Sequence, residues 1–326
     1  MNLGIILATF LPASLFLSIL FPNPSNGVSG HTSPFRYLLS LSIPAFIGWK
    51  ALNKKSLDLS GFLTAMMCGF VLTLSNYCFT VSLLVFFVSS SKATKYKSER
   101  KREIEVDYKE GGQRNWVQVI SNGGVATLLA IFYLLQNGSG ETAINFITDY
   151  ETSWLATSAL GAICCANGDT WASELGSVLS TGNPYLITTL KPVPKGTNGG
   201  ISIIGLIVSA LGGIVVSFGF LLTLMLCVES EAYNSSPPQW PLLIVGLFSG
   251  LFGSLVDSLL GATLQYSGFD KETNKVVEIE GQHIQHISGR LLLDNHSVNL
   301  LSNLFTAIVS PYFALYLWTN ISSIET

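Results

Sequence analysis

Long apolar stretches alternate with short polar ones along the whole chain. Most of them reach or approach the roughly 20 residues that an α-helix needs to cross a bilayer core. We expect about nine membrane-spanning helices, at residues 3–21, 35–52, 59–76, 77–91, 116–136, 153–180, 199–228, 240–262 and 298–319. Pro44 makes the second segment the weakest, and only Ser75-Asn76 separates the third from the fourth, so one long helix is the alternative there. The pattern predicts an all-α polytopic membrane protein, with residues 1–326 forming a single membrane domain.

Composition supports this class. The mean hydropathy is +0.47 and only 11% of the 326 residues are charged, which is too apolar for an ordinary soluble domain. All lysines and arginines except Arg36 fall in or beside four loops, at residues 53–58, 92–115, 181–198 and 263–297. Because basic loops stay in the cytosol, we expect these loops and the N-terminus to be cytosolic. Sequons at Asn137, Asn234 and Asn320 then lie on the opposite side.

The cytosolic loops differ in character. The loop 92–115 is basic, with Arg100-Lys101-Arg102 at its centre, and either rests on anionic lipid headgroups or covers a polyphosphate. The loop 181–198 is the glycine-rich one. Within 263–297, strand-forming residues flank the turn-rich segment Asp270–Asn274, which predicts a short β-hairpin.

Carboxylates inside the apolar segments are the first candidates for chemistry. Such residues are costly at bilayer depth and usually mark a functional site. Asp169 and Glu174 lie in one segment and Asp257 in another, all toward the cytosolic side. We expect Asp169 to bind Mg²⁺, which prefers oxygen ligands and needs few of them from the protein; Asp257 is either a second ligand or hydrogen-bonded to a neighbouring helix. Glu174 is about 140° around the helix from Asp169, so it either serves the same catalytic site or pairs elsewhere.

A glycine-rich loop follows the first two carboxylates. Glycines allow close approach to phosphate, and the next helix would offer its N-terminus to an anion. The phosphate-binding candidates are Lys191, Lys195, Gly196, Thr197, Asn198, Gly199 and Gly200, although the loop lacks the ending of a Walker motif. Further polar residues that we expect to line the site at the same depth are Asn122, Asn167, Ser258, Asp294 and Asn295.

Several of these segments resemble the transmembrane protein 19 family, in the expected order over nearly the whole chain. They are Phe87–Lys95, Gly112–Val119, Ser121–Ala126, Gly168–Glu174, Pro194–Gly200, Val256–Thr263 and Leu293–Asn295. The wider family includes the phytyl-phosphate kinase of plastid tocopherol synthesis and is distantly similar to CTP-dependent dolichol and phytol kinases. The resemblance implies metal binding by Asp169 and Asp257 and phosphate binding by Gly196–Gly200. A plant branch of the family is described as a glucose-responsive membrane regulator of growth.

Three functions remain open at this point. The first is a kinase that transfers phosphate from a nucleoside triphosphate, CTP or ATP, to a prenyl or similar lipid monophosphate, with Mg²⁺ as cofactor. The second is a cation- or proton-coupled transporter, which would require polar residues across the full membrane depth. The third is a non-catalytic regulator of glucose-responsive growth. The expected partners are the bilayer and the lipid substrate rather than nucleic acid, and the expected location is the plasma membrane or an endomembrane.

Overall fold

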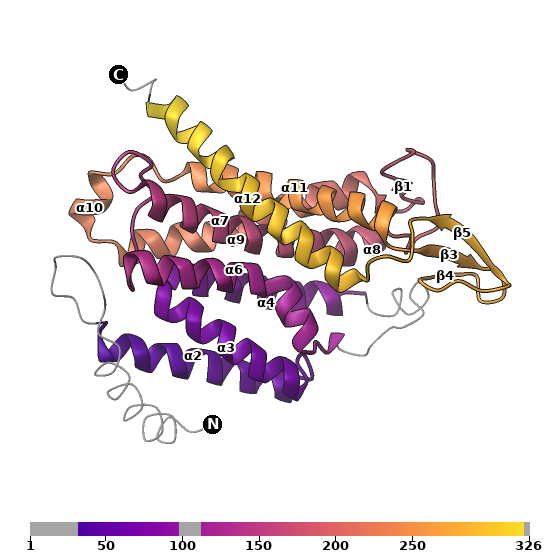
Figure 1. The fold of residues 1–326 in the computed structure, drawn as a ribbon, viewed down its shortest axis with the longest axis horizontal. Coiled ribbons are helices and arrows are strands. Elements are labelled where there is room, and N and C mark those ends of the chain that lie inside the picture. The colour runs from indigo at the N-terminus through magenta and orange to yellow at the C-terminus, as the bar shows by residue number, and fades with distance from the viewer. Residues whose placement is uncertain (1–31, 98–111, 323–326) are drawn as a thin grey trace.

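The computed structural model describes residues 32–97 and 112–322 (Figure 1). The predicted segment 3–21 and the centre of the basic loop, around Arg100, lie outside the described residues. The other eight predicted segments all form helices. They are α2 (Pro34–Asn53), α3 (Leu59–Ser75), α4 (Tyr77–Lys95), α6 (Trp116–Asn137), α7 (Tyr150–Trp171), α9 (Ile203–Cys227), α11 (Pro241–Leu264) and α12 (Asn295–Ser322).

Two features of the N-terminal half depart from the sequence pattern. Pro44 does not interrupt α2, because the helix continues past it and its ring lies against Gly69 of α3. A Cβ added at Gly69 would lie 2.8 Å from the Pro44 ring, so the two helices can pack here only because residue 69 is glycine. Asn76 is extended, with φ −157° and ψ 127°, and its side chain accepts a hydrogen bond from the Cys78 N–H. The alternative of a single helix over 59–91 is therefore wrong.

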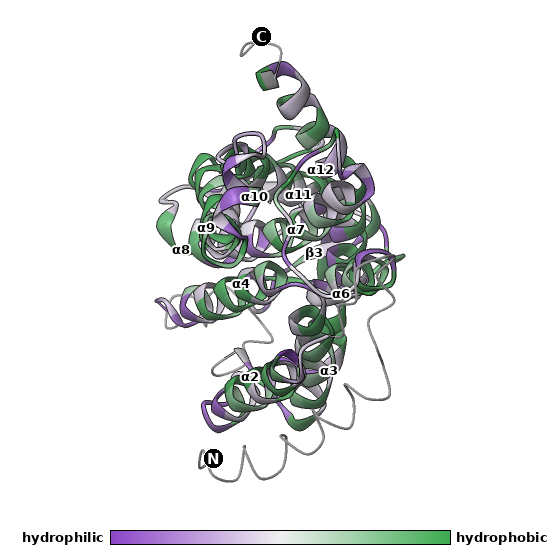
Figure 2. Cartoon of the chain, turned by 90° about the vertical axis from the view of Figure 1, so that its left-hand side faces the viewer, coloured by the Kyte–Doolittle hydropathy of each residue, from purple (hydrophilic) through white to green (hydrophobic). Residues whose placement is uncertain are grey.

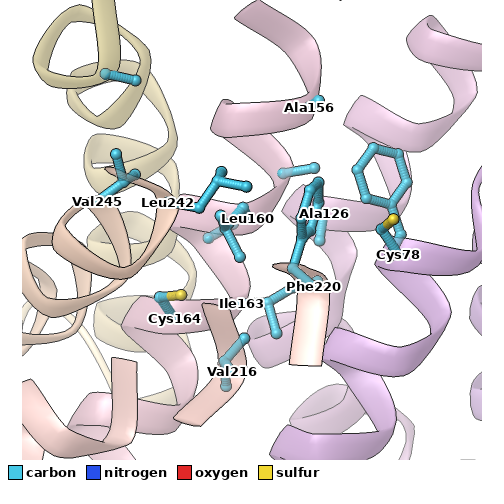
Figure 3. Packing of buried hydrophobic residues seen from close by; sticks show 14 of the residues in the cluster. Cys78, Ala126, Ala156, Leu160, Ile163, Cys164, Val216, Phe220, Leu242 and Val245 are labelled. Atoms are coloured by element: carbon cyan, nitrogen blue, oxygen red, sulfur yellow. The ribbon is translucent and has the colours of Figure 1, made fainter. Parts of the chain in front are cut away.

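Helix α7 lies at the centre of the bundle. It packs against α4, α6, α9, α11 and α12, and every residue from Ala156 to Gly168 is buried. Figure 3 shows Leu160 and Ile163 of this helix among side chains of its neighbours, including Phe220 of α9 and Leu242 of α11. Because α7 faces protein rather than lipid, it carries small and polar residues. It is accordingly not among the five described helices that are long and apolar enough to cross a membrane, namely α4, α6, α9, α11 and α12.

Glycines set the contact between α7, α9 and α11. A Cβ at Gly168 would lie 2.6 Å from the carbonyl oxygen of Gly250, and a Cβ at Gly250 would lie 2.9 Å from Cα of Gly213. Gly253 similarly faces Cys165. Small residues let helix backbones approach closely. We call this contact the glycine crossing, formed by Gly168, Gly213, Gly250 and Gly253.

The outer surface of the bundle is apolar. Exposed large side chains recur at helical spacing on α9 and α12, and Figure 2 shows that hydrophobic residues dominate the helices. The residues are Leu211, Val215, Phe218, Leu222 and Met225 of α9, and Leu304, Phe305, Ile308 and Tyr312 of α12. A surface of this kind is suited to lipid rather than water.

Short strands gather at the end of the bundle where α7 and α11 terminate, which we call the carboxylate end (Figure 1). A hairpin is present at the predicted turn, with strands shifted from the expected 264–267 and 276–279: β3 (Ser267–Asp270) pairs antiparallel with β4 (Lys275–Val277). A third strand, β5 (Ile284–Ser288), which the sequence pattern did not indicate, pairs with the other side of β3. Two residues each form β1 (Tyr185–Leu186) and β2 (Gly200–Ile201).

An ion pair at the opposite end accounts for the exceptional position of Arg36. Its guanidinium pairs with Glu141, and both side chains are nearly buried, at 11% and 9% exposure. The backbone N–H of Tyr77 also donates to Glu141 at 2.7 Å, and the Arg36 guanidinium lies 4.0 Å from the centre of the Tyr77 ring. The one basic residue outside the four basic loops is thus neutralised within the fold.

Candidate functional site

The structure brings Asp169 and Asp257 together. Helices α7 and α11 cross at Gly168 and Gly250, and both run on from there to the carboxylate end (Figure 1). Each aspartate follows the crossing by a short distance along its helix, so the two carboxylates lie within range of each other's charge. The Cys165 thiol, one turn before Asp169, lies within range of both charges.

Helix α12 supplies polar partners to Asp257. The hydroxyl of Ser302 donates to Oδ2 of Asp257 at 3.0 Å, and the side-chain amide of Asn299 donates to the same oxygen at 3.1 Å. The described residues provide no ion pair to either Asp169 or Asp257, and no hydrogen bond to Asp169. Two carboxyl groups therefore lie within range of each other in a largely apolar bundle, and the described residues place no cation beside them.

Glu174 faces another side of the bundle. The chain widens into a π-helix, η2 (Ala172–Gly176), directly after α7, and this turns Glu174 toward α4. There its carboxylate accepts a hydrogen bond from the Thr94 hydroxyl at 2.8 Å and lies near the Arg114 guanidinium. Of the two roles left open for Glu174, pairing elsewhere is the one that the structure favours. π-Bulges of this kind are frequent at functional sites.

Arg114 connects three segments that the family resemblance singled out. Its guanidinium donates to the hydroxyls of Ser90 and Ser91, both at 3.1 Å. Burial lowers the pKa of Arg114, whereas the neighbouring Glu174 carboxylate raises it. We did not predict a role for Arg114, and its contacts indicate that it joins the start of α6 to α4 and η2.

Two asparagines that were expected to line the site have hydrogen-bond partners in the fold. Asn167 is fully buried; its oxygen accepts from Ser89 at 2.9 Å and its amide donates to the Gly212 carbonyl at 2.8 Å. It therefore ties α7 to α4 and α9. The amide of Asn122 donates to the Gln118 carbonyl of its own helix at 2.9 Å.

The glycine-rich loop lies beside Asp257. Gly199, with φ +80°, rests against α11: a Cβ there would lie 2.6 Å from the Ser258 carbonyl oxygen and 2.8 Å from Cα of Ala262. Only glycine combines this positive φ with so close an approach. The loop is thus held directly against the residue that follows Asp257.

The internal bonding of this loop differs from the sequence-based expectation. The N–H groups of Thr197 and Gly200 donate within the loop, and that of Asn198 donates to Ser267, so these amides are already used in the fold. The loop also does not lead straight into a helix. Strand β2 intervenes, and α9 begins at Ile203 with Ser202 as its N-cap, so the predicted start of this helix at residue 199 is wrong.

The two lysines and the start of α12 have distinct positions. The Lys195 ammonium donates to the carbonyls of Ser177 and Ser180, at 3.2 and 2.7 Å, and so caps the end of α8 (Ser177–Leu179). Lys191 is exposed.

Asp294 caps α12 through the Ser297 N–H, and hydrogen bonding with Ser297 lowers its pKa. The exposed Asn295 accepts from Asn299 through its carbonyl.

The partners of Asp257 on α12 were missed at the sequence level. A signal for them exists, because polar residues recur at helical spacing along an otherwise apolar segment. The series is Asn295, Asn299, Ser302, Asn303, Thr306 and Ser310. Within it, Asn303 donates to the Ser121 carbonyl at 2.9 Å and Ser310 is hydrogen-bonded to Ser249 at 2.8 Å, so this stripe faces α6 and α11.

The carboxylate pair suits a divalent cation. Among the described residues no cluster of three or more histidine, cysteine, aspartate or glutamate side chains could hold a metal ion. Mg²⁺ does not need such a cluster, since it is commonly bound by one or two carboxylates together with water and substrate phosphates. Two adjacent carboxylates without a counter-charge therefore fit Mg²⁺ brought with a phosphorylated ligand better than a structural metal.

Comparison with known proteins gives relatives of full and partial length. The chain is 40% identical to Protein PGR of Arabidopsis thaliana, over 88% of this chain and 99% of that protein. It is 27% identical to an uncharacterized membrane protein of Methanocaldococcus jannaschii, over 76% of this chain and 91% of the other. It is also 29% identical to Protein VTE6, chloroplastic, of Arabidopsis thaliana, over 68% of this chain and 61% of that protein. No solved structure matches the chain significantly.

A family profile covers the whole of the site. The profile described as integral membrane protein DUF92 matches residues 42–307, which include α4, α7, the glycine-rich loop and α11. The resemblance to transmembrane protein 19 is thereby confirmed. Together with the full-length similarity to Protein PGR, this match shows that the chain is a multi-pass member of the DUF92, or transmembrane protein 19, family of integral membrane proteins.

Proposed function

We propose that the protein is a membrane-embedded kinase that transfers a phosphoryl group from a nucleoside triphosphate to a prenyl or similar lipid monophosphate. The observation that carries the proposal is the pair Asp169 and Asp257, uncompensated by any described cation and adjacent to the loop at Gly199. A pair of carboxylates beside a glycine loop is suited to a metal–phosphate complex.

In this reaction the protein mainly positions the two substrates and neutralises the charge of their phosphates. An oxygen of the lipid monophosphate would attack the terminal phosphorus of the nucleotide, and the bond from that phosphorus to the bridging oxygen would break, releasing the nucleoside diphosphate. Because the attacking phosphate is already anionic, no strong base is required. When bound, Mg²⁺ would neutralise the phosphate oxygens, and Asp169 and Asp257 would hold it. Ser302 and Asn299 would fix the orientation of the Asp257 carboxylate.

The membrane setting supports a lipid acceptor. The carboxylates lie near one end of helices whose outer faces are apolar, so a lipid with its tail along those faces could bring its phosphate to the same depth. The resemblance to a family that includes a phytyl-phosphate kinase supports phosphoryl transfer to a lipid monophosphate as the reaction. The similarity to Protein VTE6 covers only part of both chains, so it does not carry over a particular lipid. The chain length of the lipid is therefore a variable in the experiment below.

A transport path receives less support from the bundle. Buried hydroxyls do occur along the helices, but many donate to a carbonyl one turn earlier in their own helix, as Thr157, Thr223 and Thr306 do. Such side chains are satisfied internally and offer few free groups to a moving ion.

The direct test is phosphoryl transfer by the purified protein in detergent. We expect a labelled lipid diphosphate when prenyl monophosphates of several chain lengths are supplied with Mg²⁺ and CTP or ATP labelled on the terminal phosphate. A folded sample that neither forms product nor binds nucleotide would overturn the proposal. A non-catalytic regulator of growth, in the plasma membrane or an endomembrane, would then become the leading interpretation.

The proposal also includes the orientation, with the carboxylate end in the cytosol. Asn234, at the end of the short helix α10 (Ser230–Asn234), and Cys227 are exposed at the opposite end. We expect Asn234 to be glycosylated in microsomes and Asn234→Gln to remove the glycan. Asn137→Gln should leave it unchanged, because Nδ2 of Asn137 is buried.

Labelling of Cys227 with a thiol reagent tests the same membrane orientation independently of glycosylation. Cys227 is the exposed cysteine, whereas Cys68, Cys78, Cys164 and Cys165 are buried. A membrane-impermeant maleimide should label sealed, cytosol-side-out vesicles only after permeabilisation. Labelling of Cys227 without permeabilisation would reverse the assigned orientation.

A further inference from the structure

A cleft of about 260 Å³ lies between the segment that follows α8 and the β3–β4 hairpin. One wall is formed by Asn183, Pro194 and Lys195, and the other by Phe269, Asn274, Lys275 and Val276. Both walls belong to the loops and strands at the carboxylate end rather than to the membrane-crossing helices (Figure 1). A ligand of this cleft would therefore arrive from water rather than from the bilayer.

The walls of the cleft combine charge, amides and an apolar surface. Phe269 and Val276 are direct cross-strand partners, so their side chains share one face of the sheet. Lys195 is fixed in place by the Ser177 and Ser180 carbonyls, and an ammonium group with three N–H donors retains one beyond these two bonds. Lys275 adds a second cation on the opposite wall.

Two acidic side chains of the hairpin accept hydrogen bonds, and one of them, Asp270, is also the cross-strand partner of Lys275. Asp270 accepts hydrogen bonds from the Glu272 N–H and the Thr273 hydroxyl, both within the turn. Glu278 accepts from Gln265 at 2.6 Å and from Asn198 at 3.2 Å. The bond to Asn198 also ties the sheet to the glycine-rich loop.

The cleft and the carboxylate pair share that loop. From Lys195, which lines the cleft, the chain runs to Gly199, which rests on α11 beside Ser258. Gly199 is four positions after Lys195 in the chain, which corresponds to at most about 14 Å of extended chain. A ligand that starts in the cleft and follows the loop is thus directed toward Asp257.

We propose that this cleft binds the nucleoside triphosphate donor. The base lies against Phe269 and Val276, the side-chain amides of Asn183 and Asn274 face its polar edge, and the phosphates follow the loop from Lys195 toward Gly199. The inference rests on the proposed kinase function, since it identifies the donor site of that reaction. An aromatic wall beside two ammonium groups suits a nucleotide better than inorganic phosphate, which would leave the apolar surface unused.

Equilibrium binding of labelled CTP and ATP tests the inference without any transfer step. In detergent with Mg²⁺, we expect Phe269→Ala to weaken binding by about tenfold or more, because loss of a base–aromatic contact is costly. Lys275→Gln should also weaken binding, through loss of charge. Lys271→Gln is the matched control, since this lysine lies in the same hairpin but does not line the cleft.

The outcomes separate this inference from the kinase proposal. Equal nucleotide binding by Phe269→Ala, Lys275→Gln and wild type, or no binding by wild type, would overturn the cleft assignment, and transfer activity in the wild type would still support the kinase. Nucleotide binding that is lost in these variants, with no transfer to any lipid, would support the cleft and count against the kinase. If Phe269→Ala and Lys275→Gln weaken binding of a labelled prenyl monophosphate and leave nucleotide binding unchanged, the cleft belongs to the acceptor instead. Thermal unfolding of each variant verifies that it is folded.

Discussion

Asp169→Asn is expected to lower phosphoryl transfer by about a hundredfold or more while leaving the protein folded. The substitution keeps the shape of the side chain but removes one of the two charges that would hold Mg²⁺. Loss of a single group that stabilises developing charge in a transition state commonly costs that much. Asp257→Asn should act similarly, because its carboxylate lies within range of Asp169. The measurement is the rate of lipid diphosphate formation at saturating nucleotide and Mg²⁺.

The controls for this result use other carboxylates of the chain. Glu229→Gln changes an exposed acid at the opposite end of the bundle and should leave the transfer rate unchanged. Glu174→Gln tests whether Glu174 lies inside or outside the catalytic site. Because Glu174 faces Thr94 rather than Asp257, we expect a smaller loss of transfer than in Asp169→Asn. A loss as large as that of Asp169→Asn would bring Glu174 into the catalytic site. Full activity of both aspartate variants would remove the basis of the proposed site.

Arg36→Met should destabilise the protein by about 3–5 kcal/mol, the cost of breaking a buried ion pair by removing one partner. The Glu141 carboxylate would remain nearly buried, with the Tyr77 N–H as its remaining donor among the contacts described. The free energy of unfolding can be measured by denaturation in mixed micelles. Arg290→Met, at an exposed arginine, is the matched control and should change stability by less than about 0.5 kcal/mol.

A double-mutant cycle separates the pair from the individual side chains. Arg36→Met combined with Glu141→Leu removes both charges, so part of the stability lost in the single variant should return. Purely additive effects of the two substitutions would show that the ion pair contributes no coupling. Phosphoryl transfer by the double variant should persist, since the pair lies at the end of the bundle away from Asp169.

Much of the fold could be predicted because apolar length is a strong signal. Even α7, which is less hydrophobic than its neighbours, was recognised as part of the apolar segment 153–180. The third strand β5 could not be predicted in this way, since Gln-His-Ile-Gln-His-Ile does not alternate like a half-buried strand. Its pairing with β3 depends on contacts that only the folded chain provides.

The candidate site was predictable in part. Asp169 and Asp257 stood out because charges are rare inside apolar segments. The direction of Glu174 depends on the π-helix at Ala172–Gly176, which spacing on an ideal α-helix cannot represent. Asn167 looked like a site residue, but its hydrogen-bonding groups are used between helices. Polarity at a given depth thus indicated the candidate region, whereas the side-chain partners of each residue are visible only in the folded chain.

The glycine crossing has a consequence for how the protein responds to its membrane. Where Gly168, Gly213 and Gly250 meet, main chain touches main chain, and no flexible side chain lies between the helices to absorb a shift. Changes in bilayer thickness or lateral pressure would therefore be taken up by tilt of the peripheral helices such as α2 and α3. We therefore expect the spacing of Asp169 and Asp257, which lie beyond the crossing on α7 and α11, to depend little on bilayer thickness.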